Sequence, residues 1–314
     1  MSLVSFRDVV KKYDTKITVN HLSLDIGEGE VFGLLGPNGA GKSTTIHMLS
    51  GLLNASSGDI TVGGYSIKNQ PLEVKRRIGL VPQELAIYET LTARENVTFF
   101  GKLYGLRGKL LQERVAEALQ FVGLLERAGD KPQTFSGGMK RRLNIACAIM
   151  HRPKLIIMDE PTVGIDPQSR NHILDSVREL NKLGSTVIYT SHYMEEVEAI
   201  CSRVGILDNG KLIACGSKEE LKQQAGQEEK LIFEIDRKLG QAAEEMTQHP
   251  GVRRIDEQEN GTTVEVTVKE SPSMLQDLLF IIQKHGITLR KLTRVEPNLE
   301  SMFLQMTGRT LRDE

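Results

Sequence analysis

Tryptophan is absent from this chain of 314 residues, and aromatic residues make up only 5% of it. There are three cysteines, Cys147, Cys201 and Cys215, and no two of them stand in a C-x-x-C arrangement. This spacing excludes a zinc-binding pattern and a disulfide framework, so we expect buried, reduced thiols. Thiols of that kind suit a reducing cytosol.

Long apolar segments are also missing. A typical apolar run, residues 278–282, is far shorter than the ~20 residues that a membrane helix needs. The first ten residues contain no basic stretch followed by a long apolar core, so we expect no signal peptide. If the protein serves a membrane, another chain is expected to supply the spanning part.

An excess of charge of either sign is missing as well. Lys and Arg number 40 and Asp and Glu number 41, which leaves a formal net charge of −1. No overall field therefore favours nucleic acid or anionic lipid as a partner. Hydrophobic residues make up 39% and charged residues 26%, as in ordinary globular proteins. The length suffices for one large domain or two of usual size.

What is present begins with alternating strand and helix signals. A buried strand at 31–35 runs into a glycine-rich loop and then a helix at 42–52. Residues from about 85 to 135 carry apolar side chains at helical spacing, which predicts a helical insertion. Alternation of strands and helices predicts a layered α/β domain. The other expected elements are strands at 4–10, 19–26, 155–158, 186–190 and 203–207, and helices at 91–104, 110–121, 168–183 and 194–201.

The last third of the chain has a different pattern. Gln, Gly and Glu accumulate at 223–229, which indicates a domain boundary. Val264, Val266 and Val268 share one face of a strand, and residues 274–285 form an amphipathic helix. Further strands are expected at 231–235 and 287–295. We therefore predict one domain over 1–222 and a small α+β domain over 230–314.

The glycine-rich loop carries the first chemical signal. Gly36, Gly41, Lys42 and Ser43 match the pattern G-x-x-x-x-G-K-[ST] between a strand and a helix. Glycine lets backbone N–H groups converge on phosphate oxygens, and the helix start adds positive charge. Lys42 is placed to bridge the β- and γ-phosphates, and Ser43 to ligate Mg²⁺. The residues expected to hold the phosphates are Gly36, Pro37, Asn38, Gly39, Ala40, Gly41, Lys42, Ser43 and Thr44.

A second signal follows the apolar strand at 155–158, where two carboxylates stand together. Asp159 is expected to hold Mg²⁺, which prefers hard oxygen ligands. Glu160 lies beside it and is expected to polarise an attacking water. Alone, this pattern would more often be a solvated strand end, but it lies downstream of a complete phosphate loop.

The segment Phe135-Ser136-Gly137-Gly138-Met139 opens a helix about twenty residues before these acids. Together with the phosphate loop, it resembles the LSGGQ signature of the ATP-binding-cassette (ABC) family. Phe135 replaces Leu and Met139 replaces Gln, whereas the Ser-Gly-Gly centre is intact. A simple capping turn is the alternative interpretation.

The resemblance implies roles for four further residues. Tyr13 would stack on adenine, and Gln83 would meet Mg²⁺ and the attacking water. Asp166 would lie in the loop that crosses to a second cassette, and His192 would contact the γ-phosphate. Without the resemblance, Tyr13 and His192 would be taken for surface or structural residues.

The resemblance covers roughly residues 3–222 and implies the fold of a P-loop NTPase cassette, with a mixed sheet core and a helical subdomain at about 85–135. It also implies a two-part site for ATP and Mg²⁺. One subunit would supply Lys42, Gln83, Glu160 and His192 as catalytic residues, with Ser43, Gln83 and Asp159 at the metal. A second cassette, a copy or a paralogue, would supply Ser136, Gly137 and Gly138.

The cassette resembles the ATP-binding subunits of drug- and antibiotic-resistance exporters of the daunorubicin and linearmycin type, which also end in a segment like Glu296–Leu304. The resemblance implies a cytoplasmic ATPase attached to the inner face of the cell membrane through an integral permease. The exposed apolar residues Leu85–Tyr88 are the expected contact for that permease, although local packing would explain them too. The alternative is a soluble ABC-type ATPase acting on nucleic acid or the ribosome, but no nucleic-acid partner is expected.

Overall fold

The computed structural model describes residues 2–224, 229–258, 261–269, 271–295 and 302–304. Contacts between Cα atoms divide the chain into two compact units, one over residues 1–218 and the other over residues 219–308. The domain limits expected from the sequence, 1–222 and 230–314, remain a prediction. In the described residues, no helix is long and apolar enough to cross a membrane.

The first unit is built around a six-stranded mixed sheet in the order β10-β9-β3-β8-β7-β6. Five of its strands run parallel, and β10 pairs antiparallel with β9. Every residue of β3, β7 and β8 is buried, as expected for parallel strands covered on both faces. The strands are β3 (Val31–Leu35), β6 (Ile78–Val81), β7 (Leu155–Asp159), β8 (Thr186–Thr190), β9 (Arg203–Asp208) and β10 (Lys211–Ser217).

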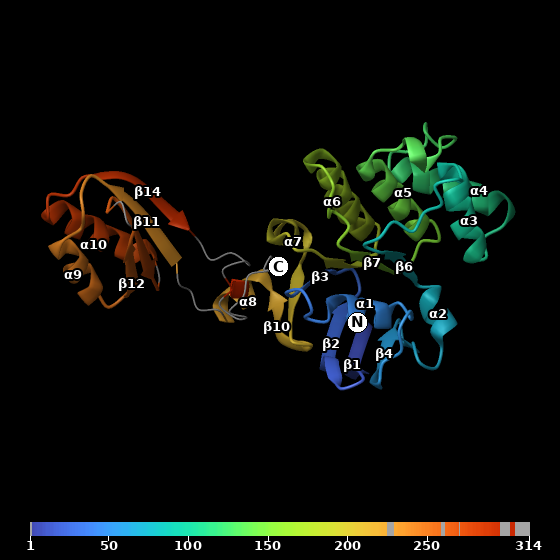
Figure 1. The fold of residues 1–314 in the computed structure, drawn as a ribbon, viewed down its shortest axis with the longest axis horizontal. Helices are drawn as coiled ribbons and strands as arrows, with labels where there is room; N and C mark the ends of the chain where they lie inside the picture. The colour runs from blue at the N-terminus through green and yellow to red at the C-terminus, as the bar shows by residue number, and fades with distance from the viewer. Residues whose placement is uncertain (1, 225–228, 259–260, 270, 296–301, 305–314) are drawn as a thin grey trace. The chain divides into compact units, whose positions relative to one another are not determined.

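A second, antiparallel sheet in the order β2-β1-β4-β5 lies beside it in the first unit (Figure 1). Phe6 and Ile60 from this sheet belong to the same buried cluster as Phe32 and Ile157 of the mixed sheet. The two sheets therefore share one hydrophobic core. The strands are β1 (Ser2–Tyr13), β2 (Lys16–Gly27), β4 (Ser57–Val62) and β5 (Tyr65–Ser66).

The predicted helical insertion at about 85–135 contains α3 and α4. The helix α5, which starts after it at Gly137, lies with them in a separate layer at one end of the first unit (Figure 1). Thr92 and Glu95 form a reciprocal capping box that fixes the start of α3. The helices of this layer are α3 (Ala93–Leu103), α4 (Gly108–Phe121), a 3₁₀ turn (Pro132–Thr134) and α5 (Gly137–Ile149). The other helices of the first unit are α1 (Lys42–Leu49), α2 (Pro71–Lys75), α6 (Pro167–Lys182) and α7 (Met194–Ile200), and α8 (Lys218–Gln224) begins at the boundary between the two units.

Two expectations need correction. The helix after the phosphate loop ends at Leu49 and not at Leu52, because Gly51 takes a left-handed φ of 68° that closes the last turn. Cys147 and Cys201 are buried as predicted, but Cys215 is only half-buried, on the edge strand β10. None of these three cysteines, all within the described residues, forms a disulfide.

The second unit has the order strand, helix, strand, strand, helix, strand, and its sheet has the order β12-β13-β11-β14. This is the arrangement of a split β-α-β fold, and it confirms the small α+β domain. Phe233 and Val266 pack with Leu278 in its core. The elements are β11 (Glu229–Ile235), α9 (Gln241–Gln248), β12 (Val252–Glu257), β13 (Thr263–Val268), α10 (Ser271–Lys284) and β14 (Leu289–Val295).

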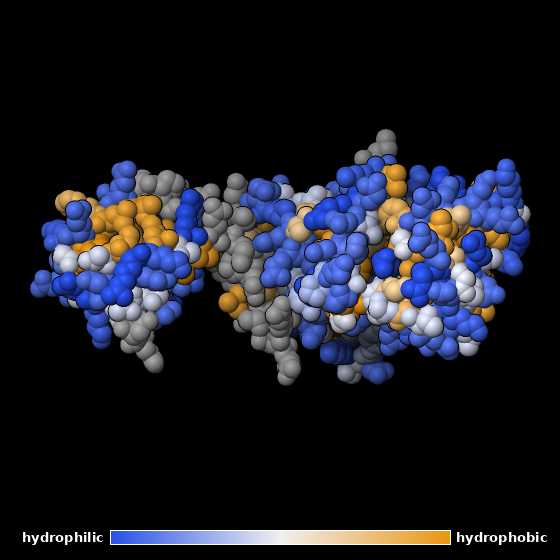
Figure 2. Space-filling view, turned by 90° about the horizontal axis from the view of Figure 1, so that it is seen from above, coloured by the Kyte–Doolittle hydropathy of each residue, from blue (hydrophilic) through white to orange (hydrophobic). Residues whose placement is uncertain are grey.

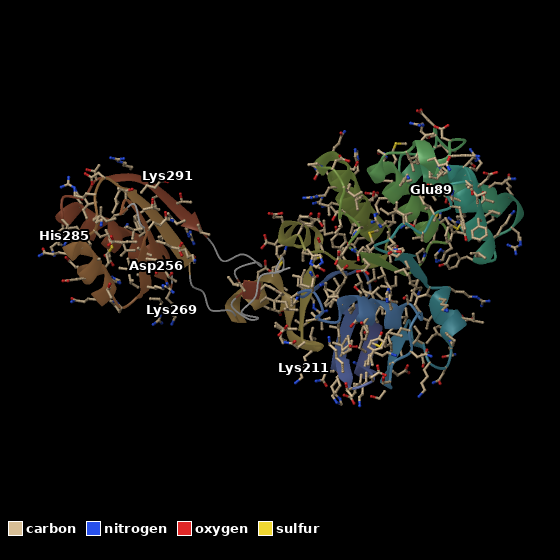
Figure 3. The ribbon with its side chains drawn as sticks, in the orientation of Figure 1. Glu89, Lys211, Asp256, Lys269, His285 and Lys291 are labelled. Carbon is tan, nitrogen blue, oxygen red and sulfur yellow. The ribbon has the colours of Figure 1, made fainter. Side chains whose placement is uncertain are left out.

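The surface of the second unit has polar and apolar parts. Lys291 and His285 are labelled in Figure 3; Lys291 pairs with Glu234 across neighbouring strands, and His285 forms a hydrogen bond with Glu245. Hydrophobic side chains also gather on one part of this unit's surface (Figure 2). Of the predicted Glu296–Leu304 segment, residues 296–301 lie outside the described part, while Met302 and Phe303 are buried.

Candidate nucleotide site

The phosphate loop joins β3 to α1 in a compact turn. Lys42 folds back over the loop, and its Nζ donates to the carbonyl oxygens of Gly36 at 2.6 Å and Pro37 at 3.2 Å. A Cβ on Gly36 would lie 2.5 Å from the carbonyl oxygen of Leu207, and Gly41 has a φ of 102°. Both positions therefore require glycine.

A hollow of about 240 Å³ opens in front of this loop. It gathers side chains from the loop, from the segment after β6, from the end of β7 and from the segment after β8. The hollow is lined by Thr18, Pro37, Asn38, Gly39, Ala40, Gly41, Lys42, Ser43, Thr44, Gln83, Glu160 and His192. The fold thus brings eleven of the predicted site residues together and adds Thr18.

Several features of this hollow suit an anion. The first N–H groups of α1 have no partner within the helix and point out of its positive end. Lys42 is only 6% exposed. Burial lowers the pKa of the Lys42 ammonium, and the negative charges of Glu160 and Asp159 oppose that shift. A buried cation beside unpaired N–H groups is a site for phosphate oxygens.

Glu160 and His192 form a close pair at the edge of the hollow. Nε2 of His192 lies 2.5 Å from Oε1 of Glu160, whose side chain is 9% exposed. Burial raises the pKa of Glu160, but the hydrogen bond from His192 and the charges of His192 and Lys42 outweigh it, so the net pKa lies below the usual value. Glu160 is therefore ionised at neutral pH and can accept a proton.

Glu160 also has a strained backbone. Its φ of 47° lies in the left-handed region, which is uncommon for a residue other than glycine. Its N–H donates to Oγ1 of Thr190 at 2.9 Å. Strain of this kind persists only where neighbouring contacts hold it.

The residues predicted at a metal ion have the right chemistry for Mg²⁺. Asp159 is buried, and Thr190 donates to its Oδ1 at 2.7 Å. That bond orients the carboxylate and uses one of its two oxygens. Ser43 and Gln83, which line the hollow, would complete a set of hard oxygen donors.

Seven predicted residues do not line the hollow: Tyr13, Gly36, Ser136, Gly137, Gly138, Asp159 and Asp166. Ser136 caps α5 by accepting from the N–H of Met139 at 3.2 Å, and Asp166 caps α6 by accepting from the N–H of Ser169 at 2.9 Å. A Cβ on Gly138 would lie 2.1 Å from Oγ of Ser169, so the two helix starts meet at a glycine. Within this chain, Ser136 therefore acts as the N-cap of α5, which was the alternative interpretation of this segment.

Tyr13 lies at the end of β1, where it pairs with Lys16 of β2. Its side chain is 46% exposed, and Nζ of Lys11 lies 5.0 Å from the centre of its ring. Thr18, which lines the hollow, follows Tyr13 by five positions in the sequence, on the second strand of the same hairpin. An adenine-stacking role for Tyr13 remains a prediction.

Two neighbouring residues of α5 hold the segment after β6, which includes Gln83. Nη1 and Nη2 of Arg141 donate to the carbonyl oxygens of Pro82 at 2.7 Å and Gln83 at 2.6 Å. Lys140 pairs with Glu89, labelled in Figure 3, at 2.5 Å. The helix that begins with Ser136, Gly137 and Gly138 is thereby tied to Gln83.

Several residues at or behind the site have no recognisable signal in the sequence. Thr18 carries no signal, because it lies on an ordinary strand and belongs to no motif. Thr190 stands two residues before His192, and Glu196 stands four after it on α7. The pairing of β7 with β8 brings Thr190 to Asp159, and this pairing cannot be inferred from spacing.

Comparisons with known proteins fit this geometry. The family model "ABC transporter" matches residues 19–163. A second model, "ATP-binding protein DrrA1-3-like, C-terminal domain", matches residues 216–307. The first match lies within the first unit, and the second covers nearly all of the second unit.

Several relatives align along nearly the whole chain. The linearmycin resistance ATP-binding protein LnrL of Bacillus subtilis is 49% identical over 99% of this chain and 100% of its own length. The Nod factor export ATP-binding protein I of Sinorhizobium fredii is 37% identical over 99% and 87%. The daunorubicin/doxorubicin resistance ATP-binding protein DrrA of Streptomyces peucetius is 34% identical over 97% and 92%.

Solved structures agree. An ATP-binding subunit of an ABC transporter superposes with a TM-score of 0.66 at 30% identity, covering 71% of this chain and 93% of that one. The ATP-binding cassette MJ0796, solved as a dimer with ADP and phosphate, gives a TM-score of 0.62 at 27% identity over 68% and 98%. The chain therefore belongs to the ABC transporter family, as an ATP-binding ATPase with a DrrA1-3-like C-terminal domain.

Proposed function

We propose that the chain hydrolyses ATP to drive export of a drug, antibiotic or lipid-like substrate through a separate membrane permease. The observation that carries the proposal is the similarity over nearly the full length to ATP-binding proteins named for resistance and export. These names do not favour the alternative, a soluble cassette ATPase acting on nucleic acid or the ribosome. Substrate export is therefore the function that the relatives support best.

The chemistry follows from the hollow. Lys42 and the N–H groups of the phosphate loop hold the phosphate chain of ATP. The ionised Glu160 accepts a proton from the water that attacks the γ-phosphorus, and the bond to the β–γ bridging oxygen breaks. Gln83 orients the water, and His192 steadies Glu160 and the γ-phosphate. The products are ADP and phosphate.

Mg²⁺ would be held by Ser43, Asp159 and Gln83, and it would neutralise the negative charge of the phosphates. Within the protein, Thr190 keeps Asp159 in place for that role. Charge neutralisation and positioning then account for most of the catalysis.

The proposal includes a second cassette. Ser136 and Gly138 do not line the hollow that Lys42 and Glu160 share. They start α5 beside Asp166, at a surface where a facing subunit could present its bound ATP. A copy of this chain or a paralogue would complete each site.

The proposal also includes a permease contact that places the protein on the inner face of the cell membrane. Leu85 is 40% exposed and Tyr88 is 48% exposed, and the Tyr88 ring packs edge-on against Phe99 at 5.1 Å. The backbone beneath is fixed, because the side chain of Asn96 bonds both the N–H and the carbonyl of Tyr88. An apolar surface on a rigid base suits a docking helix.

Docking can be tested by co-expressing the chain with its cognate permease and measuring how much of it sediments with membranes. Leu85→Asp with Tyr88→Asp should release most of the chain, while its ATPase activity without permease stays within about twofold, as expected for exposed sites. Leu183→Asp, at the residue directly after α6, is the matched control, since Leu183 is 70% exposed in the same unit.

The control variant is expected to sediment like the parent. If the Leu85 and Tyr88 variant also stayed with the membranes, the docking surface would have to lie elsewhere. If the parent chain did not sediment with membranes that contain the permease, the transport proposal itself would be wrong.

A further inference from the structure

Glu196 is a carboxylate buried behind the catalytic pair. It belongs to α7 and is 3% exposed. Its Oε2 accepts three hydrogen bonds, from Oγ1 of Thr162 at 2.8 Å, from the hydroxyl of Tyr189 at 2.8 Å and from Oγ of Ser191 at 2.7 Å. Burying a carboxylate is costly unless it is bonded and balanced, so three hydroxyl donors on one oxygen constitute a built arrangement.

Two of these donors belong to the segments that carry the reacting groups. Thr162 stands two residues after Glu160, and Ser191 directly precedes His192. Ser191 also accepts from the N–H of Tyr193 at 3.0 Å, so it fixes the turn around His192 from both sides. The third donor, Tyr189, lies inside β8 and is held by the sheet.

The charge of Glu196 is balanced from a third segment. Nε of Arg170, on α6, lies 3.3 Å from Oε1 of Glu196 in an orientation that makes no hydrogen bond. The guanidinium of Arg170 lies over the Tyr193 ring at 4.3 Å. Glu196 therefore joins the segment after Glu160, the segment with His192 and the helix that Asp166 caps.

We propose that Glu196 is a positioning residue that sets the distance between Glu160 and His192. The proposal rests on the function proposed above, in which these two residues act on ATP and water. Glu160 has a strained φ of 47°. Its 2.5 Å contact with His192 requires the segment that carries Glu160 and the segment that carries His192 to keep their relative positions. Glu196 holds the two segments at a fixed separation by accepting hydrogen bonds from Thr162 and Ser191, and it does not itself line the hollow.

The three donors permit a matched test, because each makes one hydrogen bond of 2.7 to 2.8 Å to the same oxygen. Thr162→Val and Ser191→Ala should each lower kcat roughly tenfold to a hundredfold, the cost of a small misplacement. The KM for ATP should stay within about twofold, because the phosphate loop is untouched. Tyr189→Phe should leave kcat within about twofold, since β8 holds its own backbone.

A double-mutant cycle provides the second measurement. Glu196→Gln should lower single-turnover hydrolysis in the parent chain but change it little in a Glu160→Gln background, because the positioned group is already gone. Equal losses of kcat for Tyr189→Phe, Thr162→Val and Ser191→Ala would overturn the proposal and leave Glu196 a structural residue. Multiplicative effects of Glu196→Gln and Glu160→Gln would also overturn it. If Glu160→Gln alone hydrolysed ATP at the parental rate, the proposed function would fail instead.

Discussion

At the scale of single residues, burial disfavours the charged form of both Glu160 and His151, but the two residues end in different charge states. Around Glu160, neighbouring positive groups outweigh burial and keep the carboxylate ionised. His151 has no such neighbour, and burial lowers its pKa to about 4. Its ring stacks on Tyr104 with 3.5 Å between centroids, and its Nε2 lies 3.1 Å from the carbonyl oxygen of Ile78. The folded chain therefore holds His151 neutral.

That neutrality makes stability depend on pH. An unfolded histidine titrates near 6.5, so the unfolded chain binds an extra proton between pH 6.5 and about pH 4. The stability contributed by neutral His151 is complete above pH 6.5 and is lost as the pH falls through that window. Because of His151, we expect the free energy of unfolding to be about 2 kcal/mol lower at pH 5 than at pH 7.

Urea unfolding at both pH values measures this loss. His151→Phe keeps an aromatic ring against Tyr104 and cannot be protonated, so the difference between pH 7 and pH 5 should shrink by about that amount. Equal pH dependence in parent and variant would show that His151 is not held neutral.

At the scale of elements, α5 connects two parts of the proposed mechanism. It starts at the residues expected to face a second cassette and reaches Gln83 through the guanidinium of Arg141. Arg141 is 4% exposed, and burial lowers its pKa. Arg142, next along the helix, donates instead to the carbonyl oxygen of Val122 at 2.9 Å, within the helical layer.

These neighbours make a comparison possible. Arg141→Met removes the donors to Pro82 and Gln83, so the segment that carries Gln83 should shift and kcat should fall roughly tenfold. Arg142→Met breaks a bond of the same kind to Val122 and should lower the melting temperature while changing kcat by less than about threefold. Steady-state ATPase assays measure kcat for both variants, and thermal melts measure their melting temperatures. Similar kcat values for the two variants would mean that α5 does not position Gln83.

Prediction from the sequence succeeded where the signal is local. The phosphate loop, β3, β7 and β8 were located because a motif or an unbroken apolar run marks each one. The β12 strand was missed because four of its six residues are polar or charged and no clean alternation marks a buried face. The α2 helix, with five residues, is too short for helical periodicity to be visible. The network around Glu196 was missed because its partners meet only through the packing of β8, α6 and α7.

At the scale of the whole molecule, the arrangement of the motifs supports the proposed second cassette. Lys42, Glu160 and His192 share one hollow, whereas Ser136 lies outside it at the start of α5. If each hollow is closed by Ser136 of a facing copy, then two inactive chains can restore one complete site. That possibility separates a shared site from two independent ones.

We therefore expect an equimolar mixture of Lys42→Ala and Ser136→Asp chains to hydrolyse ATP well above the sum of the two alone. Aspartate still caps α5, but its charge would repel the γ-phosphate of a facing subunit. In a mixed dimer both lesions fall in one composite site, and the other site is intact. Mixing the Ser136→Asp chain with one carrying both substitutions restores no complete site and should give only background activity. Strictly additive rates in both mixtures would show that copies of this chain do not share their nucleotide sites.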